Sequence, residues 1–377
     1  MKKLQVIDLV RTLSILVVLA GHLQALFINN GSKYYFLEYL WFKFWLNHGF
    51  GVSIFFVVSG FLITRLLAQD EQGLYNPDMR NFYVRRAGRI FPLLLLICLI
   101  RIAVNFTADT KTIPFQHCFG DPKSITSVIL WVSIATFSMN WYKLSLIFHP
   151  VNLGLHWYVL WSLSIEEQFY FFYPFLLKKL GGQRNLVLFL ALMILLGPLS
   201  ILAAWQYYPR DNNFFYNSFA AFNMIAMGCL LYLASERYHL MLKTEKRKSL
   251  LLCLSGLLIL WVVYFHVYVR IDYWWTIWGN NFIGIAAFLF LLGGLHMEFF
   301  EKKFWSFLTL PGRLSYGIYL FHSTVLFILW PYLGGLNQWV AFFFFSAATT
   351  AVAWLSFRFF EVPANLWVRK VTGRPAA

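Results

Sequence analysis

Long apolar stretches separated by short polar segments fill almost the whole chain. A helix that crosses the hydrocarbon of a bilayer needs about 20 mostly apolar residues. Runs of roughly that length lie at 4–28, 42–67, 89–106, 125–147, 156–177, 185–208, 214–234, 249–269, 274–297, 314–333 and 338–360. The pattern predicts an all-α polytopic membrane protein, and the segments between the runs are too short to form a separate soluble domain.

The Lys and Arg residues decide how many of these runs cross the membrane. Cytoplasmic loops of membrane proteins carry an excess of basic residues. If the run at 125–147 does not cross, 23 of the 31 basic residues face the cytoplasm; if it does cross, 15 of those 23 move outside. We therefore predict ten transmembrane helices, both termini in the cytoplasm, and one interfacial or re-entrant segment near 125–147.

Composition supports a single transmembrane domain over residues 1–377. Hydrophobic residues make up 60% and charged residues 12% of the chain, whereas soluble proteins are about 25% charged. Ordinary soluble enzymes and disordered proteins are thereby excluded. The net charge of +15 follows mainly from topology, so no nucleic-acid partner is expected. The four cysteines show no CxxC spacing, and we expect neither a disulfide framework nor a metal site.

The first apolar run carries ionisable side chains at membrane depth, where they are costly and usually functional. Arg11 and His22 are eleven residues apart, which on a helix places them on one face and about 16 Å apart along the axis. Asp8 lies one turn before Arg11 and could pair with it. Histidine is suited to accept a proton near neutral pH, so His22 is a candidate general base; a structural core histidine is the alternative.

Arginines cluster where the third predicted span begins. Arg86 and Arg89 are three residues apart, and Arg85 is adjacent. Guanidinium groups bind phosphates with paired hydrogen bonds. Phosphate binding and simple anchoring at the cytoplasmic membrane surface are both compatible with this fragment.

Other ionisable residues lie deeper in the predicted spans. Glu166 and Glu167 fall near the bilayer midplane, where adjacent side chains point about 100° apart on a helix, so only one of the two easily faces a given cavity. We predict a functional carboxylate there, with a structural ion pair as the alternative. His322 is interpreted as a helix-packing hydrogen bonder or a further site candidate. Arg101 is expected to be ion-paired or to extend its head toward the membrane surface.

The run GFGVSIFFVVSGFLI at 49–63 is rich in small residues, which allow helices to approach closely. Ser59 in this run is a further candidate site residue. Signature motifs of nucleotide hydrolases, serine hydrolases and zinc proteases do not occur in the sequence.

Six segments, in this order, resemble the membrane-bound acyltransferase family 3, which O-acylates bacterial surface glycans and some small acceptors. They are Arg11-x10-His22, the run at 49–63, Arg86-Ala-Gly-Arg89, WSLSIEEQFY at 161–170, LSYGIYLFH at 314–322 and RFFEVP at 358–363. The resemblance spans nearly the whole chain. It implies a bacterial multi-pass protein of the cytoplasmic (inner) membrane with ten helices.

The resemblance also implies an activity and roles for residues. The donor would be cytoplasmic acyl-CoA, commonly acetyl-CoA, without a metal, and the acceptor a hydroxyl of a surface glycan or lipid-linked sugar. His22 matches the catalytic histidine and Arg11 its basic partner, while Arg86 and Arg89, with Arg85, match the donor side. Glu166 and Glu361 match acidic motif positions, and the family is looser at Glu167.

The expected domain content and one competing class of protein complete the interpretation of the sequence. Many members of the family carry an additional C-terminal esterase-like domain; this chain ends without one, so we expect a stand-alone form that transfers the acyl group directly. The competing class is a transporter or channel that uses the same buried charges for proton or solute passage. Such a protein would support flux across vesicles without acyl-CoA.

Overall fold

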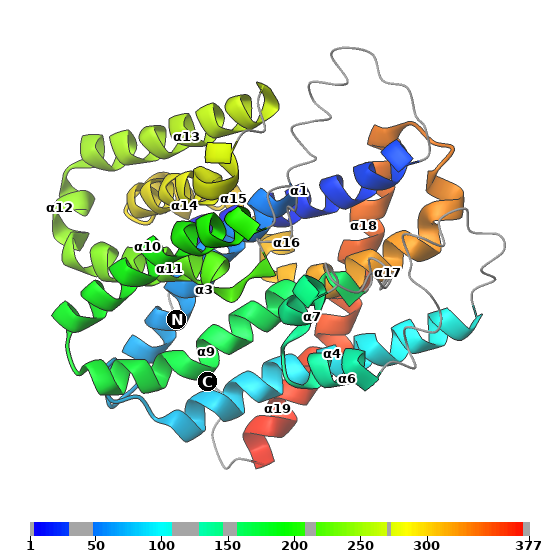
Figure 1. Ribbon diagram of the computed structural model, residues 1–377, viewed down its shortest axis with the longest axis horizontal. Helices are drawn as coiled ribbons and strands as arrows, with labels where there is room; N and C mark the ends of the chain where they lie inside the picture. The colour runs from blue at the N-terminus through cyan, green and yellow to red at the C-terminus, as the bar shows by residue number, and fades with distance from the viewer. Residues whose placement is uncertain are drawn as a thin grey trace. The chain divides into compact units, whose positions relative to one another are not determined.

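The computed structural model describes residues 4–29, 48–107, 128–145, 157–207, 216–269 and 273–371. Within these ranges every regular element is a helix and none is a β-strand (Figure 1). A helix satisfies its backbone N–H and C=O groups internally, which is the requirement that a bilayer imposes on a spanning segment. The predicted all-α class is confirmed.

The described chain forms two compact units. The first comprises Met1–Asn76 and Ile165–Arg313, and the second comprises Pro77–Ser164 and Leu314–Ala377. The long helices of the first unit are α1 (Gln5–Asn29), α3 (His48–Ala68), most of α9 (Leu160–Leu180), α10 (Gln183–Tyr207), α11 (Ser218–Arg237), α13 (Lys246–Val269) and α14 (Tyr273–Gly294). Its short helices are α12 (His239–Thr244), η3 (Glu298–Glu301), α15 (Trp305–Leu308) and α16 (Leu310–Arg313).

The second unit contains the remaining helices. They are α4 (Met79–Thr107), α6 (Val128–Ala135), α7 (Met139–Ser145), the first turn of α9, α17 (Ser315–Leu333), α18 (Gln338–Ser356), the π-helical turn η4 (Phe357–Glu361) and α19 (Val362–Val371). In this unit α19 packs against α4, where Gly88 leaves room for the side chain of Val368.

Nine helical stretches in the described ranges are long and apolar enough to cross a membrane. They are Gln5–Phe27, Gly49–Ala68, Met79–Val104, Gln183–Ala204, Ser218–Arg237, Lys246–Tyr264, Ile277–Gly294, Ser315–Leu333 and Gln338–Val368. The remaining predicted span, at 156–177, corresponds to α9. This helix has 21 residues and carries Glu166 and Glu167 in its interior, and it is not among the nine. A multi-pass helical membrane protein is therefore confirmed.

The run at 125–147 is divided within its described part. Helix α6 has eight residues and α7 has seven, so at 1.5 Å per residue each is about 10–12 Å long and too short to cross. Phe137, at the turn between them, has a left-handed φ of 52°, and the N–H of Ser138 donates to the carbonyl of Ser133 at 2.8 Å. The structure thus agrees with the expectation that this segment does not span as one helix.

Two predicted boundaries are wrong because apolar runs and helices do not end at the same residues. Helix α4 begins at Met79, ten residues before the run at 89–106, because the carboxylate of Asp78 accepts from the N–H of Asn81 at 2.9 Å and caps the helix. The last run, predicted at 338–360, continues as helix through η4 and α19 to Val371.

Glycines allow the helices of the first unit to pack at close range. A Cβ on Gly60 of α3 would collide with the carbonyl oxygen of Ile225, and one on Gly228 of α11 would collide with that of Val57. The two backbones are therefore closer than any other residue pair would permit. The predicted role of the small residues in the run at 49–63 is confirmed for Gly60.

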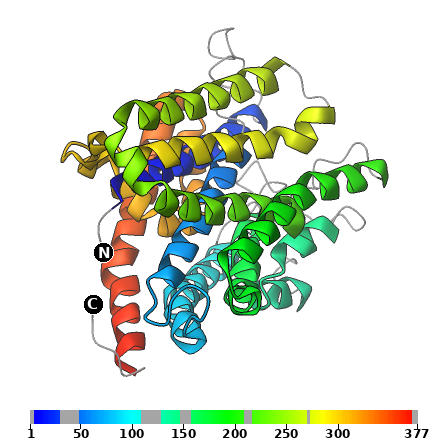
Figure 2. The same cartoon turned by 90° about the vertical axis from the view of Figure 1, so that its left-hand side faces the viewer.

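Helices α13 and α14 run side by side in the same unit, as Figure 2 shows. Their contact also depends on glycines: a Cβ on Gly256 of α13 would meet the carbonyl oxygen of Ala286, and one on Gly293 of α14 would meet that of Ser249. Tight interhelical contact through small residues is thus a repeated feature of this unit.

The predicted orientation can be tested with a topology reporter. We expect a reporter fused near Pro209, between the predicted fifth and sixth spans, to report an extracytoplasmic position, because the basic residues flanking this segment lie mostly at the other helix ends. A reporter in the segment Arg237 to Lys248 serves as the opposite-side control. A cytoplasmic signal near Pro209 would contradict the ten-span topology.

Candidate functional site

Helix α1 carries the two residues of the predicted Arg-x10-His pair. It is unbroken from Gln5 to Asn29 and contains no proline, so the helical arithmetic that places Arg11 and His22 on one face applies. Side chains on a helix lean toward its N-terminus, so the Arg11 side chain leans away from His22. With about 16 Å between them along the axis, the two side chains are too far apart to contact the same small chemical group.

The ring of His22 is half-buried, and a backbone bond sets its tautomer. Its Nδ1 lies 2.9 Å from the carbonyl oxygen of Val18, one turn earlier on α1. A carbonyl can only accept, so in the neutral ring the proton is on Nδ1 and the lone pair that can take a proton is on Nε2. This tautomer suits a general base.

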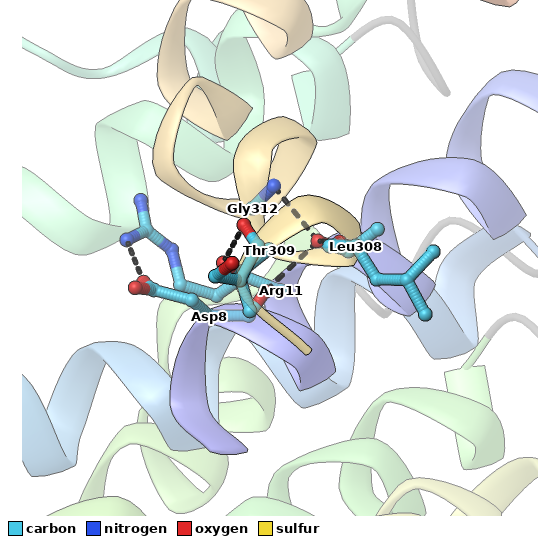
Figure 3. A network of polar contacts seen from close by, with 7 residues as sticks. Asp8, Arg11, Leu308, Thr309 and Gly312 are labelled. Atoms are coloured by element: carbon cyan, nitrogen blue, oxygen red, sulfur yellow. Dashed lines mark hydrogen bonds and ion pairs between the residues drawn. The ribbon is translucent and has the colours of Figure 1, made fainter. Parts of the chain in front are cut away.

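Arg11 pairs with Asp8 as predicted. The Nη1 atom of Arg11 lies 3.5 Å from Oδ1 of Asp8, and both side chains are largely buried, with 14% and 20% of their surface exposed. Figure 3 shows the two side chains next to each other on α1, beside the turn of chain that carries Gly312.

The turn between α15 and α16 packs against this part of α1. The hydroxyl oxygen of Thr12 lies 2.9 Å from the carbonyl oxygens of Asp8 and Leu308, which share its O–H as acceptors. The same oxygen accepts a hydrogen bond from the N–H of Gly312 at 2.9 Å. A Cβ on Gly312 would collide with the carbonyl of Asp8. The N-terminal half of α1 is thus held by hydrogen bonds that no sequence motif indicated.

A second polar cluster joins α3 to α9. The hydroxyl of Ser59 donates to Oε1 of Glu166 at 2.7 Å and is also hydrogen-bonded to the phenol of Tyr170. Tyr170 is buried, while Ser59 and Glu166 are half-buried. Two predicted candidates, Ser59 and Glu166, are therefore brought together, and the adjacent Glu167 follows on the half-buried next position of α9.

In the second unit the three predicted donor-side arginines lie on α4. Arg85 and Arg89 are exposed and Arg86 is half-buried. The Nε of Arg85 donates to Oδ1 of Asn81 at 2.7 Å, back toward the start of the helix. Glu361, from the π-helical turn η4, is close enough to Arg89 for an electrostatic interaction. Two sequence motifs about 270 residues apart therefore meet in one unit.

His322 of α17 is fully buried in the second unit. Its Nδ1 lies 2.5 Å from the carbonyl oxygen of Tyr319, and the phenol of Tyr319 donates to the carbonyl of Val159 at 2.8 Å. The ring therefore has the same tautomer as His22 but contacts no solvent. This agrees with the interpretation of His322 as a helix-packing residue.

The predicted residues fall into three groups. Asp8, Arg11 and His22 share α1, Ser59 and Glu166 are bonded, and Arg89 lies near Glu361. The bond of Glu166 to Ser59 is described, whereas its predicted role in orienting His22 stays a prediction. Tyr170 was not predicted as a site residue, although it is the last residue of the WSLSIEEQFY segment. Among the described residues, no three His, Cys, Asp or Glu side chains gather as a metal site would require.

Residues 4–358 match a protein family described as "Acyltransferase domain". The matched range contains every predicted site residue except Glu361, which lies just beyond it. No solved structure matches the chain.

Named relatives agree with this match. A Listeria monocytogenes protein named peptidoglycan O-acetyltransferase OatA is 31% identical over 378 residues, which cover 95% of this chain and 55% of that protein. A Staphylococcus aureus protein named O-acetyltransferase OatA is 28% identical over 340 residues, which cover 85% of this chain and 53% of that protein. The chain spans about half the length of these curated relatives.

Proposed function

The chain belongs to the acyltransferase-domain family, and from this premise we propose that it is a bacterial membrane O-acyltransferase. Its donor is acyl-CoA, with acetyl as the acyl group, and its acceptor is a sugar hydroxyl of a cell-wall glycan or lipid-linked precursor. The observation that carries the proposal is the family match over residues 4–358, and the similarity to proteins named O-acetyltransferases supports it.

His22 is the general base in the proposed reaction. Its Nε2 takes the proton of the acceptor hydroxyl while the hydroxyl oxygen attacks the thioester carbonyl carbon. The C–S bond then breaks, the thiolate leaves and takes up the proton from the imidazolium, and the products are the sugar ester and CoA. The bond from Nδ1 to the carbonyl of Val18 supports this role because it holds the one N–H proton of the neutral ring on Nδ1 and leaves Nε2 free to accept a proton.

The remaining residues of the first unit position the reacting groups. Arg11 acts on the distal, phosphate-bearing part of the donor, because its separation from His22 along α1 is too large for both to contact the reacting carbonyl. Glu166 provides the negative charge that balances an imidazolium formed on His22. The hydrogen bond from Ser59 at 2.7 Å supports a fixed orientation for this carboxylate.

The arginines of α4 hold the donor on the cytoplasmic side. Arg86 and Arg89 lie one turn apart on the same helix face and bind phosphate oxygens of CoA, with Arg85 adjacent. Glu361 keeps the side chain of Arg89 oriented through their electrostatic interaction. The proposed location is the cytoplasmic membrane, where acyl-CoA is reached from the inner face.

Acyl transfer by the purified protein tests the proposal. Protein in detergent or lipid nanodiscs is incubated with acetyl-labelled acetyl-CoA and a cell-wall glycan fraction, and both free CoA and labelled glycan are measured. We expect CoA release coupled to labelling of the glycan. Solute flux across vesicles in the absence of acyl-CoA, together with no thioester turnover, would favour the transporter class and contradict the proposal.

Arginine substitutions test the donor site. Replacing Arg86 or Arg89 with Gln should raise the KM for acetyl-CoA about tenfold or more, because each loses a charge-assisted hydrogen bond of about 1.5–3 kcal/mol. The value of kcat should change much less. Arg184→Gln, at an exposed position on α10, is the matched control. An unchanged KM for both variants would place the CoA phosphates elsewhere.

A further inference from the structure

Arg101 lies inside the second unit, near the end of α4 that is opposite the donor-side arginines. Twelve residues separate it from Arg89, or about 18 Å of helix. Its side chain is only 3% exposed. The sequence-based expectation that the guanidinium extends to the membrane surface is therefore wrong, because other side chains enclose it.

The guanidinium of Arg101 uses only part of its hydrogen-bonding capacity. Its Nη2 donates to the carbonyl oxygen of Leu320 at 2.9 Å and to the hydroxyl of Ser323 at 3.2 Å, and its Nε donates to Thr324 at 3.4 Å. The Nη1 atom is buried and has no hydrogen-bond partner. Because Nη1 carries two N–H groups, two of the five donors of this side chain are unused.

No negative charge balances Arg101 among the described residues. The groups that interact with its charge are the thiol of Cys98 and the phenol of Tyr319, neither of which is normally ionised at neutral pH. Its guanidinium carbon lies 5.5 Å from the centre of the Trp157 ring, which offers a cation–π contact and no formal charge. The expectation of an ion pair is also wrong. A buried, unpaired cation in a membrane helix is costly unless a ligand supplies a negative charge and hydrogen-bond acceptors.

The surroundings of Arg101 provide further groups that suit a sugar. Ser323 and Thr324 are buried, accept bonds from the guanidinium, and each keep one O–H that can be donated to a ligand. The ring of Trp157 stands edge-to-face with that of Trp131 at 5.5 Å, and aromatic faces are the surfaces on which sugar rings stack. Unused N–H donors, hydroxyls and aromatic rings are thus found together.

From these contacts we propose that Arg101 is the charged centre of a binding site for the carboxylate of an acidic acceptor sugar. The inference rests on the proposed function, because it assigns to the acceptor a part of the second unit distant from the CoA phosphates. In the predicted orientation this end of α4 lies in the outer half of the membrane, on the side from which an extracytoplasmic glycan arrives. The hydroxyls of Ser323 and Thr324 and the ring of Trp157 favour a sugar over a lipid phosphate.

Two sugars that differ by one acidic group test the site directly. Glucuronic acid carries a carboxylate on its ring, and glucose is the same sugar with a hydroxymethyl group in that place. Thermal unfolding of the full chain in phosphatidylcholine nanodiscs is followed while each sugar is titrated. We expect glucuronic acid to raise the unfolding midpoint, glucose to have a much smaller effect, and Arg101→Gln to weaken the acidic-sugar affinity about tenfold or more.

Variants separate ligand binding from a purely structural role. Arg101→Gln should fold, since removing an unpaired buried charge does not leave another charge without its partner. In transfer assays it should raise the KM for the acidic acceptor and leave the KM for acetyl-CoA unchanged. Arg101→Lys, which keeps the charge, should restore part of the acceptor affinity, and Arg184→Gln is the control for loss of an exposed charge.

The outcomes distinguish this inference from the proposed function. Equal responses of wild type and Arg101→Gln to the two sugars would overturn the carboxylate site, as would a stabilisation of wild type over Arg101→Gln seen only in phosphatidylglycerol nanodiscs, which would assign Arg101 to a lipid phosphate. Absence of thioester turnover by wild type would contradict the proposed activity, while the sugar titration would still report on the site.

Discussion

Replacing His22 with Gln should lower kcat for acyl transfer by about 10²–10⁴-fold, the range that a positioned general base contributes. Glutamine keeps the size of the ring and its ability to donate a hydrogen bond to the carbonyl of Val18, but it cannot accept a proton from the acceptor hydroxyl. The KM for acetyl-CoA should change little, because the phosphates are assigned to other residues. Steady-state kinetics with labelled acetyl-CoA measures both constants.

Two other histidines provide controls for this experiment. His239 is exposed at the start of α12, so His239→Gln should retain full activity. His322 has the same bond from Nδ1 to a backbone carbonyl but is fully buried, and His322→Gln should affect stability more than the chemical step. Loss of kcat in the His322 variant with normal transfer by His22→Gln would move the base to the second unit.

Replacing Gly60 with Ala should strongly destabilise the first unit. The added Cβ would collide with the carbonyl oxygen of Ile225 and crowd the N–H of Cys229, both backbone groups of α11, so a whole helix must shift. We expect a loss of about 3 kcal/mol or more, at the upper end of the cost of overpacking. Thermal unfolding in detergent and the yield of monodisperse protein measure this loss.

Gly49 is the matched control for Gly60, because it lies on the same helix and a Cβ there would meet nothing within 4 Å. Alanine favours the helix over glycine by up to about 1 kcal/mol. Gly49→Ala should therefore leave the stability unchanged or raise it, although the chemical change is identical. A Gly60→Ala protein as stable as the Gly49→Ala protein would show that α3 and α11 do not pack at the distance described.

The sequence alone predicts the membrane class, the number of apolar runs and the expectation that the run at 125–147 does not cross as one helix. These features depend on local composition and on the distribution of charge along the chain, and these two properties determine which segments enter the bilayer and in which orientation. The spacing of Arg11, His22 and Asp8 was equally predictable, because residues on one unbroken helix have a fixed geometry.

Helix ends were predicted less well, for a physical reason. The start of α4 depends on a capping bond from Asp78 and not on where apolar residues begin. The arginines at 85, 86 and 89 were therefore expected at the beginning of a helix and lie two to three turns inside it.

Which polar side chains come into contact follows from the tertiary fold. The pairing of Ser59 with Glu166, the approach of Glu361 to Arg89 and the unbalanced guanidinium of Arg101 all join residues that are far apart in the chain. No periodicity encodes such contacts, because they depend on the register in which helices pack, and glycines such as Gly60 set that register by close backbone approach. The sequence identifies charged residues that are costly within a membrane, and helix packing determines which residues they contact.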